Sequence, residues 1–204
     1  MAKVSELVRS TLSNANIYLD RPGNVLREKL VKQGITVLGN GAYGAAIEEA
    51  GEVFKIFGKE EVGYGAFLQY LKGKSSVLLP RVKVIGSFGS FTCAHIERLH
   101  PMANEIGGDL ACEVASWISY VAHKEYAKLT GGHCYWTRHR FPEAASQFVN
   151  KTNMVGLVKK MVAWSVENEG SLDRQLTFDL HHGNMMVRRN DDGTKQIVIT
   201  DPFC

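Results

Sequence analysis

The stretch that decides the fold reads LGNGAYGAAIEEAGEVFKIF and spans residues 38–57. Its first half carries the pattern G-x-G-x-x-G at Gly39, Gly41 and Gly44. Short strand-like runs stand at residues 35–38, 45–48 and 52–56, separated by the turn-forming pairs Asn40-Gly41 and Ala50-Gly51. Runs and turns alternating in this way predict three short strands, with the glycine pattern in the first turn.

The glycine pattern alone is a weak signal, because two kinds of nucleotide-binding fold use it. In a dinucleotide-binding fold it connects a strand to a helix, whose N-terminus faces the pyrophosphate. In a kinase it connects two antiparallel strands, and its backbone N–H groups fold over the ATP phosphates. No helical pattern begins at Gly44. The kinase setting also requires a lysine in the third strand, and Lys55 stands there between apolar residues. A solvent-facing lysine is the plain alternative, which the upstream glycines disfavour.

A second group of polar residues lies in the stretch TFDLHHGNMMV, residues 177–187. Asp179 and Asn184 have the spacing of D-x-x-x-x-N in a kinase catalytic loop. A strand-like run at residues 197–200 leads to Asp201, and a hairpin would bring Asp201 back beside Asn184. Carboxylate and amide oxygens suit a hard cation such as Mg²⁺. The alternative is a helix cap at Asp179 and a turn residue at Asn184, which the order of the motifs along the chain disfavours.

Several histidines and one cysteine resemble zinc ligands at first sight. His181 and His182 are adjacent in the chain, so their side chains point in different directions, and no cysteine pair stands near them. A zinc site is therefore not expected there. We expect surface or packing roles for His133, Cys134 and His139 as well.

Further apolar runs extend the pattern on both sides. Helical spacing predicts helices at residues 4–12, 25–31, 60–71, 108–128 and 154–167. Strands are predicted at residues 81–85, 90–96, 185–187 and 197–200. We expect turns at residues 21–24, 86–89 and 190–193, and a loop at residues 131–141. The chain is therefore predicted to be α+β, with a β-rich part at residues 1–99 and a helical part at residues 100–204.

The composition is that of an ordinary soluble protein. Hydrophobic residues make up 45% of the 204 residues and charged residues 22%, which excludes collagen-like, coiled-coil and disordered classes. The formal net charge of +3 is too small to indicate nucleic-acid binding. The four cysteines are scattered, and are expected to be reduced thiols of a cytosolic protein. No signal peptide or membrane-spanning run is evident, so we expect no membrane attachment.

The stretch FDLHHGN at residues 178–184 resembles the Asp-Leu-His-x-Gly-Asn catalytic loop of aminoglycoside phosphotransferases and other kinase-like enzymes. Over residues 37–202 the chain resembles more closely the serine/threonine protein kinases of T7-like bacteriophages. The stretches that carry this resemblance are LGNG at residues 38–41, VFK at 53–55, FDLHHGN at 178–184 and ITDP at 199–202.

This resemblance implies a minimal two-lobed kinase-like fold, with an antiparallel β N-terminal lobe and a mainly helical C-terminal lobe that ends just after Asp201. It implies an early phage enzyme of the host cytoplasm that uses ATP and Mg²⁺. Its implied substrates are serine and threonine residues in host bacterial proteins of transcription and RNA processing.

The same resemblance assigns roles by position. It implies that Asp179 orients or deprotonates the acceptor hydroxyl, that Asn184 and Asp201 bind Mg²⁺, and that Lys55 holds the ATP phosphates. Residues 95–99 would connect the two lobes and lie against the adenine. The other implied ATP-binding residues are Gly39, Asn40, Gly41 and Gly44 of the glycine pattern, and Glu97 and Leu99 of the connector.

The chain departs from typical protein kinases at three places. Thr177-Phe178 stands where they have His-Arg, and Asp201-Pro202-Phe203 replaces D-F-G. The helix after Lys55, which should offer a glutamate to that lysine, has Glu60 and Glu61 only at its start and Gln69 in its middle. The sequence ends at Cys204, so we expect no activation loop, and an acceptor protein held by other surfaces such as residues 131–141.

Two other functions stay open at this point. One is a small-molecule kinase of the aminoglycoside type, although Arg138, His139 and Arg140 stand where an acidic pocket for a cationic substrate would be expected. The other is a catalytically weak or inactive protein of the same fold that binds and inhibits a host factor. The presence of Lys55, Asp179, Asn184 and Asp201 argues against the second alternative, whereas the chain end soon after Asp201 and the lack of a glutamate in the middle of the helix after Lys55 argue for it.

Overall fold

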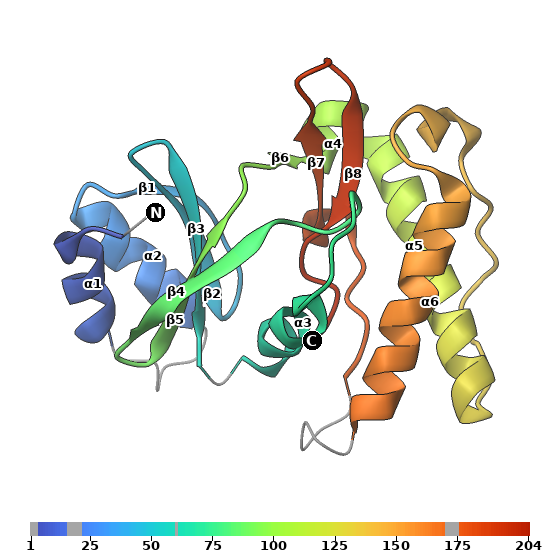
Figure 1. Ribbon diagram of the computed structural model, residues 1–204, viewed down its shortest axis with the longest axis horizontal. Coiled ribbons are helices and arrows are strands. Elements are labelled where there is room, and N and C mark those ends of the chain that lie inside the picture. Colours follow the sequence, from blue (N-terminus) through green and yellow to red (C-terminus); the bar gives the residue numbers. More distant parts are fainter. Residues whose placement is uncertain (1–3, 16–21, 60, 170–175) are drawn as a thin grey trace. The chain divides into compact units, whose positions relative to one another are not determined.

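The structure is a computed structural model that describes residues 4–15, 22–59, 61–169 and 176–204 (Figure 1). It is α+β, with two antiparallel sheets and helices. The chain divides into two compact units. The first unit contains residues 1–62 and 81–98, and the second contains residues 63–80 and 99–204. The division at residues 99 and 100 expected from sequence stays a prediction.

The first unit is built on a five-stranded antiparallel sheet in the order β1-β2-β3-β5-β4. Its strands are β1 (Thr36–Asn40), β2 (Gly44–Glu49), β3 (Glu52–Gly58), β4 (Val82–Phe88) and β5 (Phe91–Ile96). All five were predicted from sequence. The turn predicted at residues 86–89 is wrong in extent, because β4 continues through Phe88. The reversal is made at Gly89, whose φ of 56° favours glycine.

Two helices, α1 (Glu6–Ser13) and α2 (Pro22–Lys32), pack against this sheet (Figure 1). They contribute Leu12, Leu26 and Leu30 to a core that also contains Phe54 and Ile56 of β3, and all five side chains are almost fully buried. Burial of each such side chain stabilises the fold by about 1.5–3 kcal/mol. The two helices are therefore an integral part of the first unit.

The turn predicted at residues 21–24 is wrong for residues 22–24, which form the first turn of α2. A proline fits the first helical position, because its missing N–H has no partner there and its fixed φ suits a helix. Arg21 lies outside the described residues. The Pro-Gly-Asn composition indicated a turn, and tertiary packing of the following residues made it a helix start instead.

The second unit combines a three-stranded sheet with helices. Its strands are β6 (His100–Pro101), β7 (Met185–Arg189) and β8 (Lys195–Ile199). Its helices are α3 (Val62–Leu71), whose first residue belongs to the first unit, α4 (Met102–Ile106), α5 (Gly108–Thr130) and α6 (Lys151–Asn168). It also contains the 3₁₀ turns η1 (Glu143–Gln147) and η3 (His182–Asn184). The long helices α5 and α6 lie side by side (Figure 1). The sequence predicted α3, α5, α6, β7 and β8, and a loop at residues 131–141. It missed β6 and α4, which are too short to show periodicity.

The segment around Phe203 is part of the core of the second unit. The Phe203 ring contacts those of Phe67 in α3, Trp164 in α6 and Phe178, with centroids 6.4, 5.9 and 5.6 Å apart. A Cβ atom at Gly63 would overlap the Phe203 carbonyl oxygen, so α3 can approach this segment only because it has a glycine there. The residues just after Asp201 are thus fixed by close packing.

Candidate functional site

Residues 179–184 form a loop of the second unit that is closed at both ends by one segment, residues 200–202. At one end, the Asp179 N–H donates to the Pro202 carbonyl oxygen at 3.0 Å. At the other, the N–H and the hydroxyl of Thr200 donate to the Asn184 carbonyl oxygen at 3.0 and 2.9 Å. Backbone bonds therefore set the separation of Asp179 and Asn184. We call residues 179–184 the polar loop.

The side chain of Asn184 points back into the polar loop. Its Nδ2 donates to the carbonyl oxygen of Asp179 at 2.8 Å and to the carboxylate oxygen Oδ2 of Asp179 at 3.1 Å. With both amide hydrogens used in this way, Oδ1 is the atom of Asn184 that can bind a ligand. The sequence predicted that these two residues act together, and the structure brings them into contact.

His181 is a further member of the polar loop. Its Nδ1 accepts from the Gly183 N–H at 3.0 Å, so the neutral imidazole carries its proton on Nε2. This Nε2 lies 3.6 Å from Oδ2 of Asp179. A Cβ atom at residue 183 would lie only 2.7 Å from the His181 ring, so Gly183 leaves space for the imidazole. Sequence reasoning missed this orienting role, since it considered His181 only as a metal ligand.

Asp201 follows β8 and is half-buried. Because Met185 in β7 pairs with Ile199 in β8, the hairpin brings the chain at Asp201 back to Asn184, as the sequence predicted. A carboxylate and an amide oxygen form a hard donor set that fits Mg²⁺ better than a soft metal. In the described part of the chain, no three His, Cys, Asp or Glu side chains gather as a metal centre would require.

Helix α5 supports the polar loop from the interior. The hydroxyl of Ser119, whose side chain is buried, donates to the Leu180 carbonyl oxygen at 2.9 Å. Leu180 itself is buried as well. The only sequence signal for this contact is a small polar residue on the apolar face of a long helix, which the sequence interpretation passed over.

In the first unit, the glycine pattern joins the antiparallel strands β1 and β2. This arrangement excludes the strand-to-helix turn of a dinucleotide-binding fold. A Cβ atom at Gly44 would overlap the Ile56 carbonyl oxygen of β3, so close strand packing requires this glycine. Nothing lies within 4 Å of a Cβ atom at Gly39 or Gly41. Side chains could therefore be placed at both positions without a clash, and the Gly41 N–H donates within the loop, to the Gly44 carbonyl oxygen at 3.0 Å. Residues 39–44 are the glycine loop.

The glycine loop also contacts α2. The Asn40 amide Nδ2 donates to Oδ1 of Asn24 at 2.8 Å, and the Gly23 N–H donates to the Ala42 carbonyl oxygen at 2.9 Å. Sequence reasoning missed Gly23 and Asn24 as partners of this loop, because it placed both in a turn between helices. No signal in the sequence alone joins residues so far apart.

Lys55 lies in the middle of β3, as predicted, with Ala46 of β2 and Ala94 of β5 as its cross-strand neighbours. Its chain neighbours Phe54 and Ile56 face the core formed with α1 and α2, so Lys55 points to the opposite face of the sheet. The side chain is half-buried. Two alanines beside it leave its long side chain room to reach a ligand over that face.

The helix after Lys55 does not itself supply the glutamate that was expected to pair with this lysine. Helix α3 begins at Val62 and contains no glutamate, and Gln69 is exposed. Glu61 precedes α3 and is half-buried, whereas Glu60 lies outside the described residues. The helix predicted to start at residue 60 thus starts at Val62, after Glu61, whose N–H donates to the Gly58 carbonyl oxygen at 3.0 Å.

The predicted connector runs out of β5. Glu97 pairs with Arg81: its carboxylate accepts from the Arg81 N–H at 2.8 Å, and its own N–H donates to the Arg81 carbonyl oxygen at 3.1 Å. Leu99 is half-buried and begins the second stretch of the second unit. The structure thus groups Asp179, Asn184 and Asp201 in the second unit, and the glycine loop, Lys55 and Glu97 in the first.

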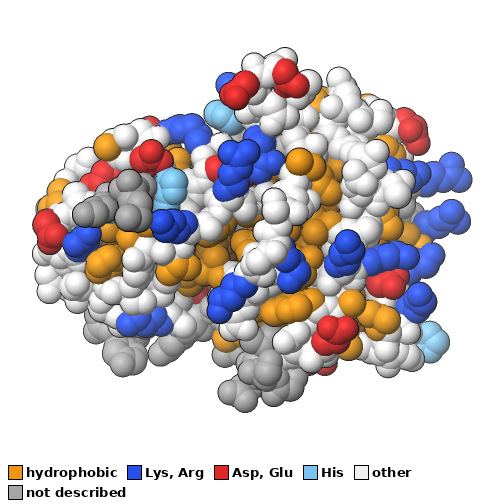
Figure 2. Space-filling model, viewed as in Figure 1, with side chains coloured by type: hydrophobic (Ala, Val, Ile, Leu, Met, Phe, Trp, Pro, Cys, Tyr) orange, Lys and Arg blue, Asp and Glu red, His pale blue; other side chains and the backbone are white. Residues whose placement is uncertain are grey.

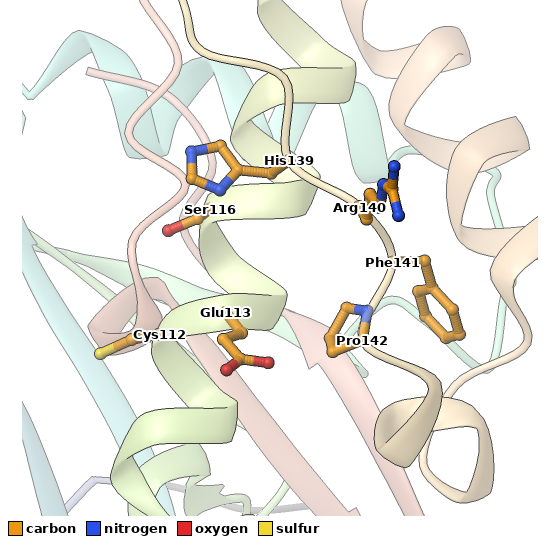
Figure 3. A pocket seen from close by; sticks show the side chains of 7 residues that line it. All are labelled: Cys112, Glu113, Ser116, His139, Arg140, Phe141 and Pro142. Carbon is orange, nitrogen blue, oxygen red and sulfur yellow. The ribbon is translucent and has the colours of Figure 1, made fainter.

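A pocket of about 400 Å³ lies in the second unit, beside the N-terminal part of α5 (Figure 3). Its walls are Cys112, Glu113 and Ser116 of α5 and the facing residues His139, Arg140, Phe141 and Pro142. Phe141 fixes the second wall, because its ring contacts Trp117 with centroids 4.8 Å apart. Lys and Arg side chains gather along this edge of the unit, at the right of Figure 2. None of the site residues predicted from sequence lines the pocket.

No protein-family model matches the chain, and no curated protein is significantly similar to it in sequence. Roles for its residues therefore rest on its own geometry and chemistry. No helix in the described part of the chain is both long enough and apolar enough to cross a lipid bilayer.

Proposed function

We propose that the chain is an ATP- and Mg²⁺-dependent protein serine/threonine kinase with a two-lobed kinase-like fold. The observation that supports this most is the closed polar loop, in which Asn184 donates to the carboxylate of Asp179 while keeping one oxygen for a cation. A phosphoryl-transfer enzyme needs these two functions, a carboxylate at the acceptor and a metal ligand, at a fixed short separation. The resemblance in sequence extends the proposal to a bacteriophage enzyme acting in the host cytoplasm on proteins of transcription and RNA processing.

In this proposal the carboxylate of Asp179 accepts a hydrogen bond from the hydroxyl group that is to be phosphorylated. Its side chain is 45% exposed, so a serine or threonine of another protein can reach it. Asn184 and His181 both lie against Oδ2, which leaves Oδ1 to accept the hydroxyl proton or to orient it. General-base assistance of this kind contributes a factor of about 10²–10⁴ to the rate.

The residues proposed to bind the nucleotide are those that the resemblance in sequence assigns. Asn184 Oδ1 and the Asp201 carboxylate would hold Mg²⁺, which neutralises charge on the phosphates when bound. The ammonium group of Lys55 would bind the phosphates themselves, together with backbone N–H groups of the glycine loop other than that of Gly41, which donates to the Gly44 carbonyl oxygen. Gly39 and Gly41 support this role, because both positions are open and neither has a positive φ that would require a glycine.

The acceptor protein would contact the segment after α5. Tyr135 is 90% exposed there, and Arg138 and Arg140 are exposed as well. The pocket beside this segment includes Ser116, one helical turn before the Ser119 that holds the polar loop. Trp136 of this segment stacks on His123 of α5, and His123 contacts the ring of Phe178, which precedes the proposed base in the chain.

The test is transfer of label from γ-labelled ATP with Mg²⁺ in a bacterial lysate, with wild type and Asp179→Ala compared. We expect labelled serine or threonine in proteins, reduced about 10²-fold or more by the substitution. Label confined to small molecules would support a small-molecule phosphotransferase instead. Protein labelling that does not depend on Asp179, or no labelling, would overturn the proposal in favour of a binding protein without activity.

A matched control separates loss of chemistry from loss of folding. Asp191→Ala removes an exposed aspartate from the turn between β7 and β8, and we expect wild-type labelling. Thermal unfolding of both variants should match wild type, because Asp179 is partly exposed and its backbone bond to Pro202 remains.

A further inference from the structure

The first turn of α2 is seated against the glycine loop. The Gly23 N–H, at the second helical position, donates to the Ala42 carbonyl oxygen at 2.9 Å. Beside it, Oδ1 of Asn24 accepts from Asn40 Nδ2 at 2.8 Å. Two neighbouring residues of the helix thus bond to two residues of the loop, one through the backbone and one through side chains.

Gly23 allows this approach because it has no side chain. A Cβ atom there would overlap the Gly41 carbonyl oxygen and lie 2.9 Å from the Gly44 carbonyl oxygen and 3.0 Å from the Gly44 nitrogen. Its φ is not in the left-handed region, so helix geometry does not require a glycine. Glycine costs roughly 1 kcal/mol relative to alanine inside a helix. Contact with the loop is the physical reason for a glycine at this position.

The helix itself cannot easily move away. Leu26 and Leu30 of α2 are buried in the core of the first unit, and Lys29 donates to the Asn14 carbonyl oxygen after α1. The other side of the loop is fixed as well: the Gly58 N–H of β3 donates to the Tyr43 carbonyl oxygen at 3.1 Å. The loop is therefore held between α2 and β3.

We propose that the first turn of α2 positions the glycine loop for phosphate binding, with Gly23 and Asn24 as positioning residues. This inference rests on the proposed kinase function. Carbonyl groups bonded to α2 and β3 are turned toward their supports, and the loop keeps one shape before ATP binds. Binding then requires little additional ordering of the loop, which raises affinity.

The test compares ATP binding and turnover in wild type and Gly23→Ala. We expect the Kd for ATP with Mg²⁺, measured by titration calorimetry, and the KM for ATP to rise about tenfold. This factor corresponds to the loss of one hydrogen bond from a displaced loop N–H to a charged phosphate. The kcat should change little, because the polar loop is untouched. Amide hydrogen exchange of residues 39–44 should become faster, with or without ATP.

Two control variants change residues that do not contact the glycine loop. Gly156→Ala in α6 adds a methyl group into open space, and Glu28→Ala truncates an exposed side chain of α2 itself. Both should bind ATP as wild type does. If Gly23→Ala fails to fold, Asn24→Ala decides: it removes only the bond to Asn40, and we expect a severalfold weaker ATP affinity and faster exchange in the loop.

The outcomes keep the two proposals apart. If wild type does not bind ATP, the proposed function fails and this inference fails with it. If wild type binds ATP and both Gly23→Ala and Asn24→Ala bind it equally well, with unchanged exchange of residues 39–44, the positioning role alone is overturned. A fall in kcat at constant KM would also contradict it.

Discussion

The glycine loop of the first unit and the polar loop of the second unit are held in different ways. The glycine loop is held from outside, by hydrogen bonds to α2 and β3, and Gly44 of the loop and Gly23 of α2 leave space for these close contacts. The polar loop is closed at its base by residues 200–202 and braced from within by the side chains of Asn184 and His181. Glycines allow the close contacts of the first loop, whereas side-chain hydrogen bonds fix the shape of the second.

This difference matches what each loop would have to do. A loop that binds phosphate through its backbone has to expose N–H groups, so side chains on it would obstruct the ligand. A loop that presents a carboxylate and a metal ligand has to fix two side chains relative to each other. Substitutions should therefore affect the first loop mainly through binding and the second mainly through the rate of reaction.

The largest effect is expected for Asn184→Ala. It removes both the oxygen proposed for Mg²⁺ and the amide that holds Asp179, so the rate of label transfer should fall about 10²-fold or more. The Mg²⁺ concentration for half-maximal rate should rise as well. Initial rates over a range of Mg²⁺ concentrations measure both quantities.

Asn190→Ala is the control for this substitution. Asn190 also lies at the end of β7 and donates from its side chain, to the Thr194 hydroxyl of the turn, but it lies outside the polar loop. It should leave the rate and the Mg²⁺ dependence unchanged. A near wild-type rate of the Asn184→Ala variant would mean that the side chains of the polar loop do not determine the rate of reaction. It would therefore contradict the expected difference between the two loops.

The next largest effect is expected for Lys55→Met in the first unit. Loss of one charged bond to phosphate should weaken ATP binding about tenfold or more, measured as the Kd for ATP. Lys83→Met, on the exposed face of β4 in the same sheet, is the control and should bind ATP normally. Equal affinity of the Lys55→Met variant would mean that the first unit does not bind phosphate through this lysine.

The sequence predicted the parts of both loops that depend on local order. Strand rhythm around Gly39–Gly44 and the hairpin before Asp201 are short-range patterns, and the structure has both. The supports could not be predicted, because Gly23 and Ser119 meet their partners only through tertiary packing. Local composition even misled at residues 22–24, where Pro-Gly-Asn begins a helix. The sequence left open which acidic residue, if any, pairs with Lys55, and α3 itself contains no glutamate.

A smaller effect, on stability, is expected for Ser119→Ala. The buried Leu180 carbonyl oxygen would lose its hydroxyl donor, which should lower the free energy of unfolding by about 1–2 kcal/mol and lower the rate of label transfer. Ser165→Ala is the matched control, since this buried hydroxyl donates to the Val162 carbonyl oxygen of its own helix. Urea unfolding of both variants measures the difference. Equal losses would show that Ser119 does not support the polar loop in particular.

The smallest effect is expected from Glu105, near the sheet that carries the polar loop. Ion pairs with Arg189 and Lys195 lower the pKa of Glu105 from 4.5 to about 2, chiefly through the hydrogen bond from Arg189. Because the folded-state pKa is the lower one, this stabilisation is present above about pH 4.5 and is lost as the pH falls toward 2. Arg189 is 59% exposed, so screening should reduce the effect to about 1 kcal/mol. Urea unfolding between pH 3 and 6 should show a shallower loss of stability in Glu105→Gln than in wild type. Identical pH profiles would mean that the ion pairs of Glu105 contribute nothing to the stability of this sheet.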